Sequence, residues 1–407
     1  MTYLAVEAVR GKSDWEWKPL RRVTRIRREA NADSSSRLLA LSSERGVEYR
    51  ADDGGRQLPS DDTITGYWRV RPGDLVFNPM WAIGGGVAVS TLTGAVSTAY
   101  RIYEPSPSVW PRFLHHWLRS QPVIEQYRLL VRGSTTFDRS VTREDLDGMP
   151  IPLPPLSTQR AIADYLDRET GRLDALIAAK RRLVALSEAR WEAELSLSLW
   201  HGSQFEPVQL KFLAGLPTSG NRDHSSFISD PDGIPCVRGV DVSSGEIDIQ
   251  HVLCISAGDH AAHLNTIVRW GDLLILRSGA TAGRVALVPE KLDGCNCVDV
   301  VIVRRTTRLD PRYLVNVFRT REVREQMALR SAGALQPHFN AVDAGVLRLP
   351  YRPMTAQLSL VATLEKACAK ANAMARVLSR QVGLLQEHRQ ALVTSAVTGQ
   401  LDIPEAA

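Results

Sequence analysis

The segment PPLSTQRAIADYLDRETGRLDALIAAKRRLVALSEARWEAELSLSLW (Pro154–Trp200) joins a proline-rich start to a long run of apolar residues at helical spacing. This spacing predicts an amphipathic helix of roughly 40 residues, about 60 Å long at 1.5 Å per residue. Ser157 is expected to cap its N-terminus. Glu169 and Lys180 interrupt the apolar seam, which predicts an imperfect coiled coil. The expected seam comprises Ile162, Leu166, Leu173, Leu176, Ile177, Leu183 and Leu186.

A second copy of this pattern lies near the C-terminus of the chain. Gln357 aligns with Gln159 at a shift of 357 − 159 = 198 residues, and no gap is needed along the helical run. The same shift aligns Gly73–Val76 with Gly271–Leu274, which share the triplet Gly-Asp-Leu. Because one offset relates segments so far apart, the sequence predicts a tandem duplication. The second seam comprises Leu360, Leu364, Ala371, Met374, Leu378, Val382 and Leu385.

Short strand-like segments, punctuated by proline and glycine, precede each long helix. Helices are expected over Pro111–Leu130 and Tyr313–Leu329, and the four prolines of Met149–Leu156 predict an extended linker. Pro207–Lys211 is similar to Trp17–Arg21 at a shift of 190 residues, so insertions separate the two repeats. The expected strands are Tyr67–Val70, Leu75–Phe77, Val87–Ser90 and Ala99–Tyr103, followed by Pro235–Arg238, Leu273–Leu276, Arg284–Val288 and Val298–Arg304.

These patterns predict an α+β fold with two loop-rich, β-containing domains separated by two long antiparallel coiled-coil helices. A long amphipathic helix must bury its apolar stripe, and the other repeat supplies a partner of matching length. An internal tandem repeat of this kind predicts pseudo-two-fold symmetry. The expected divisions are a first domain at 1–153, a central helix at 154–203, a second domain at 204–352 and a C-terminal helix at 353–407.

Composition indicates a mildly basic protein of the reduced, cytoplasmic class. The formal net charge is +5 and the sequence pI is near 9.0, which permits a polyanionic partner without requiring one. The sequence contains neither a signal-peptide pattern at its start nor an apolar run long enough to span a membrane. An odd number of unpatterned cysteines argues against a disulfide framework. They are Cys236, Cys254, Cys295, Cys297 and Cys368.

The motifs resemble those of type I restriction–modification specificity (S, HsdS-type) subunits, over nearly the whole chain. The similarity rests on PIPLPPLSTQRAIADYLD (Pro150–Asp167) and LLQEHRQALVTSAVTGQLDI (Leu384–Ile403). GDLVF (Gly73–Phe77) and GDLLILRSGATAG (Gly271–Gly283) add to it. The second linker, RLPYRPMTAQ (Arg348–Gln357), is weaker, so its helix is expected to start with different packing.

The resemblance implies a non-catalytic DNA-recognition subunit. The two variable parts would be target-recognition domains, each recognising one half of a split sequence in double-stranded DNA, and the helices would be conserved spacers. The chain would bind two methyltransferase (M) subunits along its helices and restriction (R) subunits through them. S-adenosylmethionine, ATP and Mg²⁺ would be bound by those partners, and none of them by this chain.

Candidate DNA-contacting residues follow from the need for phosphate anchors and for donors and acceptors at base edges. One group is a basic run near the N-terminus, which comprises Lys18, Arg21, Arg22, Arg25, Arg27 and Arg28. Two pairs of polar loops form the other group, one pair following the Gly-Asp-Leu triplets and the other preceding the linkers. A solvated surface charge is the alternative for each arginine. The candidates are Arg21, Arg22, Arg25, Asn78, Trp81, Arg132, Ser134, Thr135, Thr136, Arg277, Ser278, Thr281, Arg330, Ser331 and Gln336.

Two other functional classes stay open at this point. Asn78–Trp81 is similar to the Asn-Pro-Pro-aromatic motif of adenine methyltransferases, but the second proline is missing and no glycine-rich cofactor loop precedes it. Bound S-adenosylmethionine would support a fused methyltransferase fragment, whereas a lack of sequence preference would support a coiled-coil scaffold. The spacing of His260, His263, Cys295 and Cys297 fits no standard zinc pattern, so no metal is expected.

Overall fold

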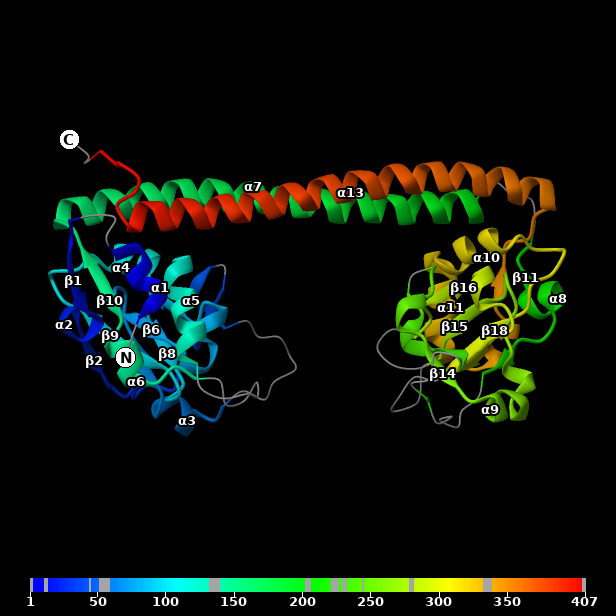
Figure 1. Cartoon of the computed structure of the whole chain (residues 1–407), viewed down its shortest axis with the longest axis horizontal. Helices are drawn as coiled ribbons and strands as arrows, with labels where there is room; N and C mark the ends of the chain where they lie inside the picture. Colours follow the sequence, from blue (N-terminus) through cyan, green and yellow to red (C-terminus); the bar gives the residue numbers. More distant parts are fainter. Residues whose placement is uncertain are drawn as a thin grey trace. The chain divides into compact units, whose positions relative to one another are not determined.

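The structure is a computed structural model that forms two compact units (Figure 1). Unit 1 comprises Met1–Arg181 and Ser379–Ala407, and unit 2 comprises Arg182–Leu378. The two long helices therefore contribute residues to both units. The structure describes residues 3–10, 14–43, 45–50, 59–131, 140–201, 206–220, 227–228, 233–243, 245–277, 282–331 and 339–404.

Unit 1 is built around a small antiparallel sheet with helices on one face. Its elements are α1 (Leu4–Arg10), β1 (Glu16–Pro19), α2 (Leu20–Val23), β2 (Thr24–Arg27), β3 (Leu39–Ser42), β4 (Gly46–Tyr49), α3 (Asp61–Thr65), β5 (Trp68–Val70), β6 (Leu75–Phe77), η1 (Pro79–Gly84), β7 (Val87–Val89), β8 (Gly94–Val96), β9 (Arg101–Pro105), α4 (Pro111–Leu118), α5 (Gln121–Leu130), α6 (Arg143–Asp147), β10 (Pro150–Leu153) and the start of α7 (Leu156–Trp200).

Unit 2 has the same order of principal elements. It comprises the end of α7, β11 (Val208–Gln209), α8 (Leu210–Ala214), β12 (Thr218–Ser219), β13 (Ile234–Arg238), η2 (Gly239–Asp241), η3 (Ile249–His251), β14 (Leu253–Ile255), α9 (Ala257–Ala262), η4 (Leu264–Thr266), β15 (Leu273–Leu276), β16 (Val285–Leu287), η5 (Glu290–Leu292), β17 (Asn296–Val298), β18 (Val300–Val303), α10 (Pro311–Phe318), α11 (Arg321–Ser331), α12 (Ala341–Gly345), β19 (Arg348–Leu349) and the start of α13 (Met354–Val397).

The central sheets of the two units have matching topology and register. The strand order is β2-β9-β6-β7 in unit 1 and β12-β18-β15-β16 in unit 2, with all neighbours antiparallel. Leu75 pairs with Val89 at the start of β6, and Leu273 pairs with Leu287 at the start of β15. The two residues of the second pair each lie 198 residues after those of the first. The duplication predicted from sequence is therefore also a duplication of structure.

Two expected helices are each broken in two. Pro111–Leu130 forms α4 and α5, which are interrupted at Arg119 and Ser120. Pro122 lies in the first turn of α5, where its missing N–H and fixed φ favour a new helix start over a continuous helix. The expected Tyr313–Leu329 helix is likewise divided into α10 and α11. The prediction of a single helix was therefore wrong in both repeats.

The proline-rich linker is extended, as expected, but it is also paired. Its residues Pro150–Leu153 form β10, which is antiparallel to β1 in a sheet of two strands. Prolines are tolerated there because a two-stranded ribbon has an unpaired edge. At the end of the ribbon, Leu20 N donates to Met149 O over 2.8 Å, and Leu210 N donates to Leu347 O over 2.9 Å in unit 2. The similarity of Pro207–Lys211 to Trp17–Arg21 is thus confirmed by the structure.

The long helices are antiparallel within unit 1, where Lys180 Nζ bonds Gln381 Oε1 over 2.6 Å and Arg389 pairs with Asp174 over 2.8 Å. The seam follows a strict three-four alternation that differs from the expected one. On α7 the seam positions, each of them buried or half-buried, are Ala163, Leu166, Thr170, Leu173, Ile177, Lys180, Val184, Ser187 and Trp191. The equivalent positions on α13, 198 residues later, run from Val361 to Arg389 and are also covered.

Four of the apolar residues assigned to the seams lie outside them and are exposed. Leu176, Leu183, Leu186 and Met374 are each 44–55% exposed. A two-helix contact covers one narrow stripe repeating every 3.5 residues, and these residues lie one position away from that stripe. Polar residues at stripe positions, such as Lys180, are covered instead. The prediction that these four residues are buried was wrong.

A buried glutamine fixes the start of each long helix. Gln159 Oε1 accepts from Trp110 N over 2.7 Å, while its Nε2 donates to Ser108 O and to Pro154 O. Gln357 Oε1 accepts from Asp310 N over 2.8 Å, and its Nε2 donates to the carbonyls of two corresponding residues, one in the loop before α10 and one in the linker. Each amide therefore holds the loop, the linker and the helix together.

The helix start itself differs from the expectation for Ser157. Helix α7 begins at Leu156, so Ser157 is its second residue and not the residue that precedes it. Gln159 N donates to Pro155 O over 3.0 Å, which places the first helical turn after the prolines. The expected N-cap position was wrong by two residues, because Pro155 is the residue that precedes the helix.

Candidate nucleic-acid interface

The Gly-Asp-Leu triplets are structural turns that lead into β6 and β15. Asp74 and Asp272 are buried, and their carboxylates accept from the backbone N–H groups of Arg71 and Arg269 over 2.6 and 2.9 Å. Burial raises the pKa of the Asp74 carboxyl, although the Arg71 N–H and the Arg27 guanidinium oppose this. Because both carboxylates bind their own turns, the motif fixes the strands and the loops that follow them.

The ends of these strands meet the segment before α6 or α12 through the same backbone bond. Val141 N donates to Pro79 O in unit 1, and Phe339 N donates to Arg277 O in unit 2, both over 3.1 Å. An arginine supports the joint in each case, but from different strands. Arg101 Nη1 bonds Val141 O, and Arg277 Nε bonds Phe339 O, both over 3.3 Å. The side chain of Arg277 is buried, so it supports the joint from inside the unit.

The basic run near the N-terminus divides into outward and inward side chains. Arg21 and Arg22 lie exposed on α2, at the start of the run. Arg25 is 81% exposed on β2 and forms an ion pair with Glu104 over 2.8 Å. Arg27 points inward instead and pairs with the carboxylate of the first Gly-Asp-Leu turn. The three predicted contacts in this run are therefore accessible to a ligand.

Asn78 and Trp81 lie at the start of η1, directly after β6. The Asn78 side chain accepts from Met80 N over 3.1 Å and caps this short helix, which gives the residue a structural role. The Trp81 side chain is 40% exposed. In unit 2, Arg330 Nη1 donates to Gln326 O over 2.9 Å on α11. Of these candidates, the exposed Trp81 is the best placed to meet a ligand.

All of these DNA contacts stay predictions, and the structure does not fully describe the remaining candidates. Ser331 is the last residue of α11, and its side chain is outside the part of the chain that the structure describes. The remaining candidates lie outside the described residues altogether. They are Arg132, Ser134, Thr135, Thr136, Ser278, Thr281 and Gln336.

Unit 1 contains a cationic cavity of about 280 Å³ that the sequence alone did not indicate. It lies where β2 and β6 end and β9 begins, beside the Val141 joint. Its four arginines come from three separate segments of the chain. The basic run pointed to two of them, Arg27 and Arg28, and no sequence pattern pointed to the other two. The lining residues are Ile26, Arg27, Arg28, Trp68, Pro79, Thr98, Ala99, Tyr100, Arg101, Ile102 and Arg143.

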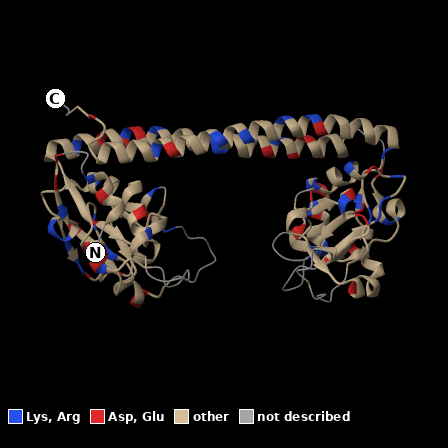
Figure 2. Ribbon diagram, in the orientation of Figure 1, with Lys and Arg blue, Asp and Glu red and all other residues tan. Residues whose placement is uncertain are grey.

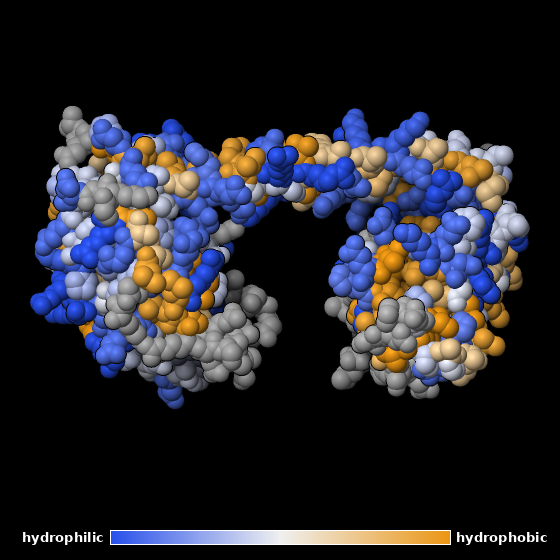
Figure 3. Space-filling view, in the orientation of Figure 1, coloured by the Kyte–Doolittle hydropathy of each residue, from blue (hydrophilic) through white to orange (hydrophobic). Residues whose placement is uncertain are grey.

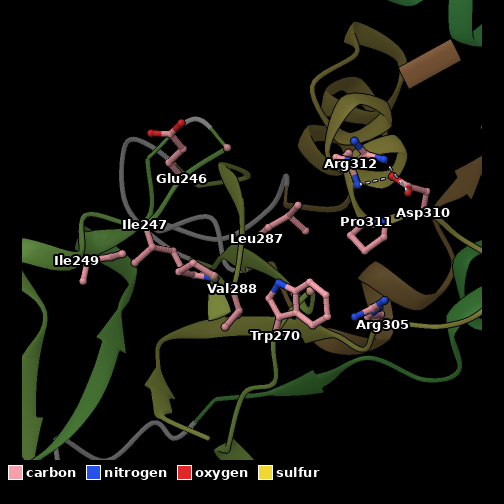
Figure 4. Close-up of a pocket in the computed structure, with 13 residues that line it drawn as sticks. Glu246, Ile247, Ile249, Trp270, Leu287, Val288, Arg305, Asp310, Pro311 and Arg312 are labelled. Atoms are coloured by element: carbon pink, nitrogen blue, oxygen red, sulfur yellow. Dashed lines mark hydrogen bonds and ion pairs between the residues drawn. The ribbon is translucent and has the colours of Figure 1, made fainter. Parts of the chain in front are cut away.

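Unit 2 contains a larger cavity, of about 640 Å³, at the opposite end of its sheet (Figure 4). The Arg305 guanidinium lies 4.4 Å from the centroid of the Trp270 ring, a cation–π contact at the mouth of the cavity. Arg312 pairs with Asp310 over 3.4 Å, and Glu246 also lines the cavity. Both signs of charge are present, so this cavity is not a dedicated anion site.

The histidines and cysteines considered for a metal site have other contacts. His260 bonds Asn296 Oδ1, and His263 Nδ1 bonds Asp259 O over 2.8 Å. Burial raises the pKa of the Cys295 thiol to about 11, so the thiol stays protonated at neutral pH. Within the described ranges, no three His, Cys, Asp or Glu side chains gather as metal ligands. Among the same residues, no helix is both long and apolar enough to cross a membrane.

Comparison with known proteins gives a sequence relative and several structural ones. No protein-family model matches the chain. The type I restriction enzyme EcoBI specificity subunit of Escherichia coli is 21% identical over 284 residues, covering 62% of this chain. That match spans only 58% of the length of the curated relative.

The folds agree over almost the full chain. A chain from a type I R-M system structure gives a TM-score of 0.71 at 18% identity, covering 95% of this chain and 98% of that one. The HsdS subunit from Thermoanaerobacter tengcongensis gives a TM-score of 0.49 at 20% identity, over 95% of this chain. The fold is thus that of a duplicated α+β protein with two domains and helical linkers. In sequence the chain is similar to a type I restriction–modification specificity subunit, as its motifs indicated.

Proposed function

We propose that this chain recognises a bipartite DNA sequence for a type I restriction–modification complex, each variable domain binding one half of the target. The observation that supports this most directly is the duplicated unit, in which matching sheets, turns and glutamine contacts frame different surface loops. A fixed scaffold with two variable surfaces suits recognition of two base clusters separated by unspecified pairs. Residues 1–153 and 204–352 would be the two recognition domains.

The long helices would set the spacing and bind the methyltransferase subunits. Several large apolar side chains stay exposed on them, an arrangement typical of protein interaction surfaces. Figure 3 shows such side chains among hydrophilic ones on the helices, and Figure 2 shows both signs of charge there. They include Leu176 and Leu384 in unit 1, and Leu183, Leu186, Met374 and Val377 in unit 2.

In this proposal the chain itself performs no catalysis. Methyl transfer and cleavage would belong to two methyltransferase subunits and to the restriction subunits bound through them. Those subunits would bring S-adenosylmethionine, ATP and Mg²⁺, and this chain would contribute the choice of sequence.

Methylation mapping tests the proposal. The chain is co-expressed with the methyltransferase subunit encoded beside it, and long-read sequencing maps methyladenine in the cellular DNA. We expect a split motif, methylated in both halves, that is absent from cells expressing the methyltransferase subunit alone. Co-purification of the two proteins without any new methylation would contradict the recognition role and leave a scaffold.

A further inference from the structure

We propose that the cationic cavity of unit 1 binds a phosphodiester group of the DNA backbone, an inference that rests on the proposed DNA-binding function. The described lining contains four arginines and neither aspartate nor glutamate. A concave surface of one sign of charge focuses the electrostatic potential and attracts the opposite charge. The cavity is therefore suited to an anion of about the size of a phosphate with its sugar.

Two of the four arginines are neutralised by carboxylates that do not line the cavity. Arg27 pairs with buried Asp74, whose carboxylate also accepts from its own turn. Arg143 pairs with Asp147 over 3.1 Å across one turn of α6. These two guanidinium groups have protein partners, so they shape the cavity and contribute little net charge.

The other two arginines retain their positive charge. Arg28 is exposed and makes no hydrogen bond or ion pair with any residue that the structure describes. Among the described residues, Arg101 bonds the carbonyl oxygen of Val141 alone, through Nη1, over 3.3 Å. A guanidinium has five N–H donors, so most of those on Arg101 are available to a ligand. The cavity thus presents about two uncompensated positive charges.

Phosphate is the group that best fits this arrangement. Guanidinium groups bind phosphate oxygens through paired, charge-assisted hydrogen bonds. The rings of Trp68 and Tyr100 also line the cavity and would pack against the neighbouring sugar. In unit 2 the joint is supported by Arg277, which is buried. The cavity described above for that unit has mixed charge. Unit 1 would therefore supply a phosphate anchor beside its joint, where the arginine of the unit 2 joint is buried.

The experiment measures binding of the full chain to a 30-base-pair duplex of random sequence over a series of salt concentrations. Arg28→Gln is expected to lower the slope of log K against log salt by about 0.9, the value for one lost phosphate contact on B-DNA. The loss should be the same for duplexes of different sequence, because phosphate is common to all. Arg28→Lys should restore the slope but not the full affinity, since lysine lacks the paired donors.

Arg45→Gln is the matched control. Arg45 is also in unit 1, with its side chain 76% exposed, and it pairs with Glu48 away from the cavity. The Arg45→Gln variant removes the same charge and should leave the slope of log K against log salt unchanged. Arg101→Lys tests the second cation while keeping its charge, and thermal unfolding checks that each variant is folded.

The outcomes separate the two proposals. If the wild-type chain binds the duplex but Arg28→Gln leaves the slope unchanged, the phosphate site is refuted while DNA binding stands. A loss confined to particular sequences would also refute it, because it would show base recognition. If the wild-type chain binds no duplex at all, both proposals fail.

Discussion

Units 1 and 2 share a frame but differ in the charges placed around it. The shared parts are backbone contacts: the Gly-Asp-Leu turns, the strand-end joints and the glutamine contacts occur at matching positions. Two buried carboxylates, Asp74 and Asp272, even accept from equivalent N–H groups. Duplication has preserved the interactions that satisfy buried backbone groups, since an unpaired buried group costs about 1–3 kcal/mol.

The differences lie in side chains that occupy equivalent places. Arg112 pairs with Asp167 on α7, and Arg312 pairs with Glu365 on α13, but only the pair in unit 1 also contacts a histidine. That histidine, His116, is buried and bonds Asp167 Oδ1 over 2.8 Å. The comparison teaches that the contacts satisfying backbone groups are shared between the units, whereas an ionisable side chain added beside them, such as His116, differs between the units.

The largest expected effect comes from removing the shared glutamine contacts. Gln159→Leu or Gln357→Leu leaves three backbone groups without their partner, at a cost of about 3 kcal/mol. Hydrogen exchange measured by mass spectrometry should show faster exchange in α4 for the first variant and in α10 for the second. Each variant should destabilise its own unit.

Gln121→Leu provides the control for these variants. Gln121 makes one exposed hydrogen bond, to Glu125 over 2.9 Å, so its loss should cost less than about 0.5 kcal/mol. If only one of the two buried glutamines proved important, the structural equivalence of the repeats would not extend to their stability.

The glutamine contacts also show what sequence can predict. The offset of 198 residues aligned Gln159 with Gln357 and predicted β6 and β15 at their observed bounds, because local pattern and repetition determine these features. The exposure of Leu183 followed from the exact register of two helices, which a broad apolar pattern does not specify.

The candidate site was less predictable than the frame. Arg21, Arg22 and Arg25 were found from a run of like charges, but the cavity joins Arg28, Arg101 and Arg143 from segments far apart. The spacing of single arginines in the sequence does not show that their side chains line one cavity, because this depends on tertiary packing.

The second expected effect is a difference in acid stability. Burial lowers the pKa of His116, and the hydrogen bond to Asp167 only partly offsets this. The unfolded histidine has a pKa near 6.5, so below that pH the unfolded chain binds a proton that the folded chain resists. Unit 1 should therefore lose stability as pH falls below about 6.5, with His116 contributing up to about 1.4 kcal/mol per pH unit.

Replacing His116 by the unit 2 residue tests this. His116 corresponds to Asn316, and His116→Asn should remove part of the acid sensitivity; His115, whose pKa is also lowered by burial, retains the rest. Burial tends to raise the pKa of Asp167, but hydrogen bonds from His116 and Arg112 hold that pKa well below its usual value. Asp167 therefore stays ionised between pH 7 and 5.5. Hydrogen exchange at pH 7 and 5.5 provides the measurement, and unchanged sensitivity in the variant would refute the assignment.

The smallest expected effect concerns the glycines of the two Gly-Asp-Leu turns. Gly73 and Gly271 have φ values of 92° and 83°, a region where a side chain costs about 1 kcal/mol. A Cβ at Gly73 would meet no atom within 4 Å, whereas one at Gly271 would lie 2.8 Å from Arg305 Cδ. Both alanine variants should therefore be destabilised, with Gly271→Ala affected more.

The extra cost at Gly271 has an identifiable source. Displacing Arg305 weakens its contact with the Trp270 ring, which is worth about 0.5–1 kcal/mol at an exposed site. The destabilisation caused by each glycine substitution is measured by urea unfolding, with hydrogen exchange in β6 reporting on Gly73→Ala and exchange in β15 on Gly271→Ala. In an Arg305→Ala background the obstacle is gone, so Gly73→Ala and Gly271→Ala should cost the same. A difference that persisted there would mean that the two turns, despite matching hydrogen bonds, are not equally strained.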